Sequence, residues 1–139
     1  MKNKFKIFTF VLLCLIVTPK NLIAGEPFIF NVTEIEILED GNIINGYKGG
    51  TATSKDGTTI SAENFFYNKK TNILKTSGNV KYLDKIKNVN IVADKATYFK
   101  NNETIHTFGN SKVFSESNII SATNLEYDKN NNFFKAKQN

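Results

Sequence analysis

The chain has 139 residues, enough for one domain, and a formal net charge of +5. That charge comes from 18 lysines, with no arginine, against 13 acidic residues, and the lysines are scattered along the chain. Nucleic-acid-binding proteins usually carry a clustered basic face with arginine, so no nucleic-acid partner is expected.

Residues 1–24 have the pattern of a secretory signal peptide. Three lysines precede an apolar stretch over residues 7–17, which is too short to span a membrane, and small residues follow at Ala24-Gly25. Cleavage there removes four lysines and leaves 14 against 13 acids, a net charge of about +1. It also removes Cys14, the only cysteine, so residues 25–139 are expected to form one exported domain without disulfides. An uncleaved membrane anchor is the alternative.

The segment from residue 28 to residue 58 predicts strands joined by tight turns. Residues 28–38 alternate between apolar and polar side chains, as half-buried strands do. Asp40-Gly41 and Asp56-Gly57 are hairpin signals. Between them, the glycines at 46, 49 and 50 predict a flexible corner, followed by a short strand at residues 51–53.

The rest of the chain repeats one sequence unit three times. The copies, each given by its isoleucine, alanine and tyrosine, are Ile60, Ala62 and Tyr67; Ile91, Ala93 and Tyr98; and Ile120, Ala122 and Tyr127. The alanines are 31 and then 29 residues apart, a period typical of stacked supersecondary units. The first two copies end at Gly78-Asn79 and Gly109-Asn110, where the third has Gln138-Asn139.

Each unit is expected to contain two strands and two turns. Apolar residues alternate up to the alanine, and the next apolar residues, from Phe65, Ala96 and Leu125 onward, have the opposite parity. A parity change at one fixed offset predicts a β-bulge or corner that keeps the apolar residues inward. Asn- and Asp-rich turns follow the tyrosines. Second, short strands then start at residues 73, 104 and 133, and segments 81–83 and 112–114 join the units.

The residue types do not favour an enzyme, a cofactor or a metal site. His106 is the only histidine and has no serine or cysteine motif around it. Glu63 and Asp94 recur after the alanines, but Thr123 takes that place in the third copy, which favours repeated surface polarity over a catalytic pair. Metal-ligand spacings are absent from the sequence.

The second unit carries a family resemblance. Ile91-x-Ala93-Asp94-Lys95-x-x-Tyr98, preceded by Ser77-Gly78-Asn79-Val80 and followed by Gly109-Asn110, resembles the organic-solvent-tolerance-like (OstA-like) domain of lipopolysaccharide transport proteins. That domain occurs in the periplasmic bridge protein and at the N-terminus of the outer-membrane assembly protein. Gln138 departs from the pattern, so the domain is expected to be incomplete at its C-terminal end.

The resemblance implies an all-β fold, a twisted antiparallel β-jellyroll that is open at its edges. It implies an apolar groove that shields the acyl chains of lipopolysaccharide and passes them between edge-docked domains. The implied location is the periplasm, in association with the outer membrane. The implied partners are lipopolysaccharide or lipid A, other β-jellyroll domains, and an outer-membrane β-barrel of the same or another chain.

Two sets of residues are candidates for these roles. The inward-facing set either fills a core or lines the groove, and it consists of Ile60, Ala62, Phe65, Tyr67, Ile91, Ala93, Tyr98, Ile120, Ala122, Leu125 and Tyr127. The edge-strand docking set consists of Phe28, Phe30, Val32, Ile35, Ile37, Phe133 and Phe134.

Two other classes of protein are alternatives. A structural β-solenoid of a surface or adhesin-type protein would use the repeat only to build a rod, but its coils repeat more strictly than spacings of 31 and 29 residues. A carbohydrate-binding jellyroll is disfavoured because the chain has no tryptophan for stacking on sugars.

Overall fold

The computed structural model describes residues 27–116 and 118–138, and the predicted signal peptide lies outside them. Nine strands and one short 3-10 turn make up this part of the chain. They are β1 (Phe28–Leu38), η1 (Glu39–Gly41), β2 (Ile43–Ser54), β3 (Thr59–Ala62), β4 (Asn64–Asn68), β5 (Ile73–Asp84), β6 (Val89–Phe99), β7 (Thr104–Ser115), β8 (Asn118–Asp128) and β9 (Phe133–Lys137).

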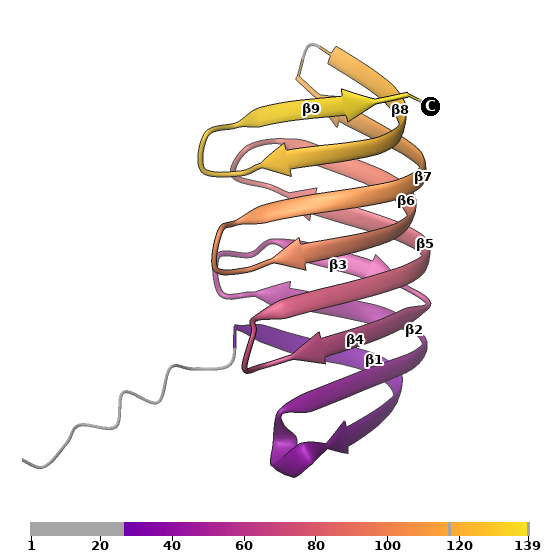
Figure 1. Ribbon diagram of the computed structural model, residues 1–139, viewed down its shortest axis with the longest axis vertical. Helices are drawn as coiled ribbons and strands as arrows, with labels where there is room; N and C mark the ends of the chain where they lie inside the picture. Colours follow the sequence, from indigo (N-terminus) through magenta and orange to yellow (C-terminus); the bar gives the residue numbers. More distant parts are fainter. Residues whose placement is uncertain (1–26, 117, 139) are drawn as a thin grey trace, which may run out of the picture.

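All nine strands belong to one antiparallel sheet in the order β1-β2-β3-β5-β6-β7-β8-β9. β3 and β4 are two halves of one strand interrupted at Glu63, and both pair with β2 and β5. The strands are stacked along the long axis and curve around it (Figure 1). The predicted all-β antiparallel architecture is confirmed, and antiparallel pairing of neighbours is unlike the parallel coils of a β-solenoid.

A crease crosses the middle of the sheet, because the strand register shifts at the same height in successive pairs. The shifts fall between Val32 and Glu34, Ser77 and Val80, Val92 and Lys95, and Phe108 and Ser111. Such bulges bend a strand. They lie where the parity of the apolar residues changes, so the predicted bulges are confirmed.

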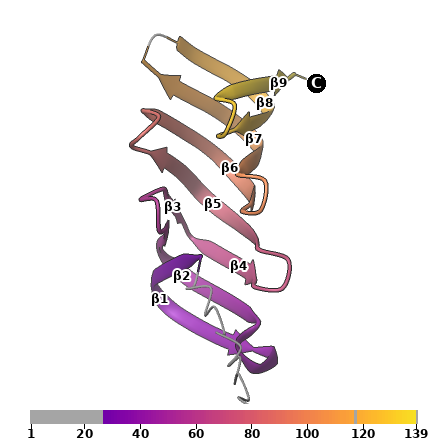
Figure 2. The same ribbon diagram turned by 90° about the vertical axis from the view of Figure 1, so that its left-hand side faces the viewer.

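The crease divides the sheet into two layers that face each other. Layer A contains the strand halves that meet at the turns after Leu38, Asn68, Phe99 and Asp128. Layer B contains the halves that meet at the turns after Ser54, Asp84 and Ser115. Both rows of turns lie on one side of the molecule, opposite the crease, and we call this the turn side (Figure 2).

The repeated acid and the Gly-Asn pair meet at the crease. Asn79 Nδ2 donates to Glu63 Oε1 at 2.6 Å, and Asn110 Nδ2 donates to Asp94 Oδ2 at 2.8 Å. The glycine before each asparagine has a positive φ, and a Cβ there would lie 2.4 Å from the carboxylate of the same acid. Glu63 and Asp94 therefore hold the bulged strand to its neighbour, which is a more specific role than the surface polarity expected from the sequence.

Two expectations about the strands were wrong. The glycines at 46, 49 and 50 do not form a corner between strands, because β2 runs unbroken from Ile43 to Ser54. Gly49 and Gly50 sit at the crease, at the register shift between β1 and β2, and the missing side chain of Gly50 lets the β1 backbone approach, since a Cβ there would lie 2.3 Å from the Asn31 carbonyl oxygen. Segments 81–83 and 112–114 are not connectors; they continue the strands that start at 73 and 104.

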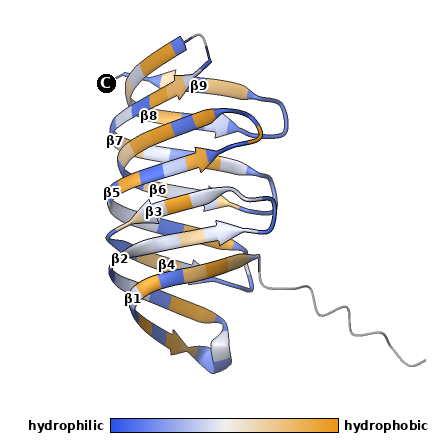
Figure 3. Cartoon of the chain, turned by 180° about the vertical axis from the view of Figure 1, so that it is seen from behind, coloured by the Kyte–Doolittle hydropathy of each residue, from blue (hydrophilic) through white to orange (hydrophobic). Residues whose placement is uncertain are grey.

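The core lies between the two layers. Apolar and polar residues alternate along the strands (Figure 3), and the inward apolar side chains are buried. The three repeat tyrosines are equivalent, since each hydroxyl donates to the residue five positions later: Tyr67 to Asn72 at 3.0 Å, Tyr127 to Asn132 at 3.2 Å, and Tyr98 to Glu103. Each acceptor has a positive φ, so the tyrosine also stabilises a strained turn.

The crease predicts a specific cost for side chains at its glycines. In Gly109→Ala, the new Cβ overlaps with Asp94. The alanine must also adopt the left-handed backbone conformation of this position, at φ +74°. The backbone alone costs about 1–2 kcal/mol, and the overlap adds roughly 1–3 kcal/mol. Gly57→Ala is the matched control, because Gly57 has φ +85° and nothing within 4 Å of the new Cβ. Urea unfolding should show a larger loss for Gly109→Ala, and equal losses would contradict the role of the crease.

Candidate functional site

The interior between the layers is occupied by a continuous column of aromatic rings. The column runs, in order, through Phe65, Phe30, Tyr67, Phe28, Tyr98, Tyr82, Tyr127 and Phe134. Successive ring centroids are between 4.5 and 6.2 Å apart, within the range of favourable ring contacts. Tyr82 joins the column from the strand segment that sequence reasoning interpreted as a connector, which is why it was missing from the inward set.

The predicted inward set lies in this interior. All of its members are buried except Ile120, which is half-buried and packs against the core. The alanines 62, 93 and 122 are buried and lie next to the crease. The described structure therefore shows these residues as a packed core, and their use as a ligand groove stays a prediction.

The interior is uncovered at its N-terminal end, where β1 is the edge of the sheet. Ile35 pairs with Gly46 and Ile37 with Ile44, which places both isoleucines on the inward face. They are nevertheless 52% and 60% exposed, because no further strand covers them among the described residues. Phe30 and Val32 of the same strand are half-buried, whereas the Phe28 side chain is fully in the core, so only its backbone is available for docking.

The interior also opens at its C-terminal end. A cavity of about 290 Å³ lies there, lined by the apolar residues Val89, Ile120 and Phe134 and by the polar residues Lys87, Ser115, Glu116, Asn118 and Asn132. β9 covers only the layer A half of β8, from Asn124 to Asp128. The layer B half, Asn118–Ala122, therefore has β7 as its only partner among the described strands. This second free edge was missed because sequence reasoning placed the edge in β9 alone.

The two phenylalanines predicted at the C-terminal edge have opposite orientations. Phe134 pairs with Tyr127 and stacks on its ring, so it faces the interior. Phe133 pairs with Asp128, points outward and is 59% exposed. Only Phe134 belongs to the opening of the interior.

The turn side is closed by charged side chains. Lys129, in a layer A turn, donates to Thr58 Oγ1 at 2.7 Å and to Asp56, and its Nζ lies 3.4 Å from Asp84 Oδ2. Those three partners belong to layer B turns. The Lys129 side chain is only 10% exposed and that of Asp84 2%. Lys100 of the neighbouring layer A turn adds a contact of 3.9 Å to Asp56. We call these five residues the turn-side cluster.

The ionisation of the cluster follows from these contacts. Burial opposes the charge of Asp56, but hydrogen bonds from Lys129, Ser54 and the Thr58 amide outweigh it and hold the pKa of Asp56 well below its usual range. Burial also opposes the charge of Lys129, yet Asp56 and the other carboxylates raise its pKa. Burial, with the nearby Asp84, raises the pKa of Tyr127 to about 12.

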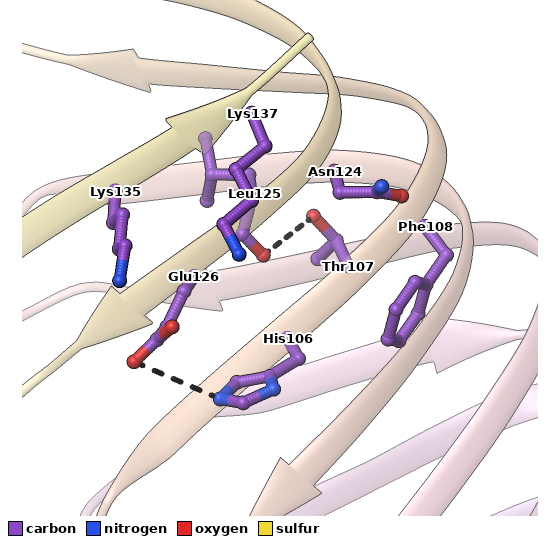
Figure 4. Close-up of a pocket in the computed structure, with 8 residues that line it drawn as sticks. All are labelled: His106, Thr107, Phe108, Asn124, Leu125, Glu126, Lys135 and Lys137. Atoms are coloured by element: carbon purple, nitrogen blue, oxygen red, sulfur yellow. Dashed lines mark hydrogen bonds and ion pairs between the residues drawn. The ribbon is translucent and has the colours of Figure 1, made fainter. Parts of the chain in front are cut away.

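A separate pocket of about 160 Å³ lies at the β9 edge (Figure 4). His106 Nε2 is 3.8 Å from Glu126 Oε1 there, and Lys135 and Lys137 complete the charged part of the lining. The volume is below the range of small-molecule sites. In the described part of the chain, no group of three or more His, Cys, Asp or Glu residues could hold a metal ion. The same part contains no helix long and apolar enough to cross a membrane.

The comparisons with known proteins give a match in structure only. No family model and no curated protein matches the chain. Among solved structures, the chain is similar to LptH of Pseudomonas aeruginosa, described as the LptA-homologous periplasmic component of the conserved lipopolysaccharide transport device. The TM-score is 0.74 over 82% of this chain and 84% of that chain, at 14% sequence identity. The two chains share one fold. The resemblance to the OstA-like domain is thus confirmed at the level of the fold.

Within this LptH-like fold, the turn-side cluster predicts how stability depends on pH. The folded-state pKa of Asp56 lies below the unfolded value of about 3.9, so its contribution is complete above about pH 5 and is lost as the pH falls toward the folded-state pKa. Asp56→Asn should therefore be less stable than the wild type at pH 7, and the difference should shrink below about pH 4. Urea midpoints from pH 7 to pH 3 measure this, and a constant difference would contradict the ionic role of Asp56.

Proposed function

We propose that this chain is a non-enzymatic carrier in lipopolysaccharide transport, which shields the acyl chains of a lipid A-type amphiphile between its two layers in the periplasm. One observation carries the proposal: the inward apolar surface continues to both ends of the described sheet, where Ile35 and Ile37 are exposed and Ile120 and Phe134 are half-buried. The fold shared with LptH supports the same function, because that protein is a component of a lipopolysaccharide transport device.

The energetics of acyl chains explain why such a carrier needs open ends. Burial of hydrocarbon stabilises by about 0.8 kcal/mol per methylene, which for a chain of a dozen carbons is on the order of 10 kcal/mol. Release of such a ligand into water is correspondingly slow. A carrier therefore has to transfer its ligand directly to the interior of a neighbour, and closed ends would prevent this.

The two ends are suited to docking by strand addition. β1 offers a free edge over both layers, and β9 and Asn118–Ala122 offer free edges at the other end. Backbone hydrogen bonds across such edges join β domains, and side chains on alternate positions supply specificity. Stacking of a second jellyroll domain would cover Ile35 and Ile37 and continue the interior. Association with an outer-membrane β-barrel, in the same or another chain, remains a prediction.

Neighbouring phenylalanines of β9 provide a test of lipid binding. A photo-crosslinking phenylalanine analogue at position 134 should label lipid A, because that side chain faces the interior beside the cavity lined by Val89 and Ile120. The same analogue at position 133 is the matched control, since it points outward from the adjacent residue. The measurement is the yield of lipid A adduct on gels after irradiation. Equal labelling at the two positions, or none at position 134, would contradict binding in the interior.

Docking at the N-terminal end can be tested separately. Ile35→Glu places a charge on the uncovered inward face of β1 and should abolish crosslinking of this edge to a second jellyroll domain. The fold should be retained, because Ile35 is already 52% exposed. Asn31→Glu adds the same charge to the outward face of the same strand and should have little effect. Site-specific crosslinking, with circular dichroism for the fold, measures both. Unchanged crosslinking of Ile35→Glu would remove this end from the docking surface.

A further inference from the structure

Within residues 27–116 and 118–138, the turn side is the boundary of the interior that is held shut by side-chain contacts. At the crease, the backbone of each long strand passes from one layer to the other. Backbone hydrogen bonds of the layer A turns run to neighbouring layer A turns, from Lys69 to Asn42, Lys100 to Asn72 and Lys129 to Glu103. In the layer B turn after Ser54, the backbone bonds of Ser54 and Gly57 stay within the turn.

Among the described residues, two lysines make the ion pairs and hydrogen bonds that join the two rows of turns. Lys129 reaches Asp56, Thr58 and Asp84, which precede it by 45 to 73 residues in the sequence. Lys100 adds its contact to Asp56. Separation of the two rows would therefore break these side-chain contacts and part the rings behind them, and would leave the strand pairing intact.

We propose that the turn-side cluster is a lateral gate, through which an amphiphile inserts its acyl chains sideways while its polar headgroup stays outside. This inference rests on the proposed function. When neighbours are docked on both ends, the ends are covered, and the crease is closed by continuous backbone. The turn side is then the remaining route from the surroundings into the interior. It is also the side along which a headgroup too large for the interior can project during transfer.

The position of Lys129 is suited to a gate. Its single ammonium group faces carboxylates of two different layer B turns, Asp56 and Asp84. Glu103 of its own layer lies 3.9 Å away, and Lys100 sits beside Asp56. Removal of one long side chain would thus release most of the contacts across the turn side. The hydroxyls of Tyr98 and Tyr127 are bonded to layer A turns, and the Tyr98 ring lies beside the cluster, with Lys100 Nζ 5.9 Å from its centroid.

A covalent lock across the turn side tests the gate. Residues 25–139 contain no cysteine, so in this part of the chain Asp56→Cys with Lys129→Cys can be joined by a short bifunctional thiol reagent. The linked protein should take up lipid A at least tenfold more slowly than the same double variant before linking. Uptake is measured as radiolabelled lipid A that co-elutes with the protein after timed mixing. Lys129→Met, which removes the ammonium group without a link, should take up lipid A faster than the wild type.

Two controls make the result specific. Cysteines at Asn102 and Asn130, in neighbouring turns of layer A that contact each other, carry the same link within one row and should leave uptake unchanged. If the first pair does not fold, Asp56→Cys with Lys100→Cys locks the same side and leaves the contact of Lys129 with Asp84 intact. Equal uptake by the cross-row and within-row linked proteins would overturn the gate while leaving the proposed function in place. Absence of uptake by the wild type would overturn both.

Discussion

The structure depends on the bend that each long strand makes at the crease. Strands of 11 or 12 residues extend about 3.3 Å per residue, and a flat sheet of them would expose one apolar face along its whole length. The bulge folds the sheet onto itself, so that the two halves of every strand bury each other. This requires the bend at the same height in every strand, and Glu63–Asn79 and Asp94–Asn110 fix that height in successive strands.

A sheet folded in this way has boundaries of three kinds. At the crease, the backbone of each long strand is continuous. At the two ends, the described strands leave edges without a neighbouring strand, and the turn side is held by side-chain contacts. A closed β-barrel would have neither free edges nor a turn side. The geometry that buries the core thus also provides the surfaces that the proposed end-to-end docking and the proposed gate would use.

Sequence reasoning succeeded where one short-range pattern determined the outcome. The alternation, the parity change after each alanine and the Asp-Gly turns predicted the strands, bulges and hairpins, and the repeat predicted the equivalence of Tyr67, Tyr98 and Tyr127. It failed where a pattern has two interpretations: the glycines near 49 suit a corner as well as a bulge inside a strand. It could not find Lys129 with Asp56, because a pair 73 residues apart depends on how the crease aligns the two rows of turns.

The hydrogen bonds of the tyrosines explain how a packed interior is compatible with the proposed role as a carrier. Tyr67, Tyr98 and Tyr127 are each bonded to the turn that follows them in layer A, while Phe28 and Tyr82 belong to strand halves of layer B. The contacts between Tyr82 and its neighbours Tyr98 and Tyr127 therefore cross from one layer to the other. If the rows of turns separate, the rings move with their own layers. An apolar seam then opens between the layers, with aromatic rings on both sides. An acyl chain in that seam would replace ring contacts with chain contacts, so the apolar surface stays shielded in both states and the empty carrier needs no permanent cavity.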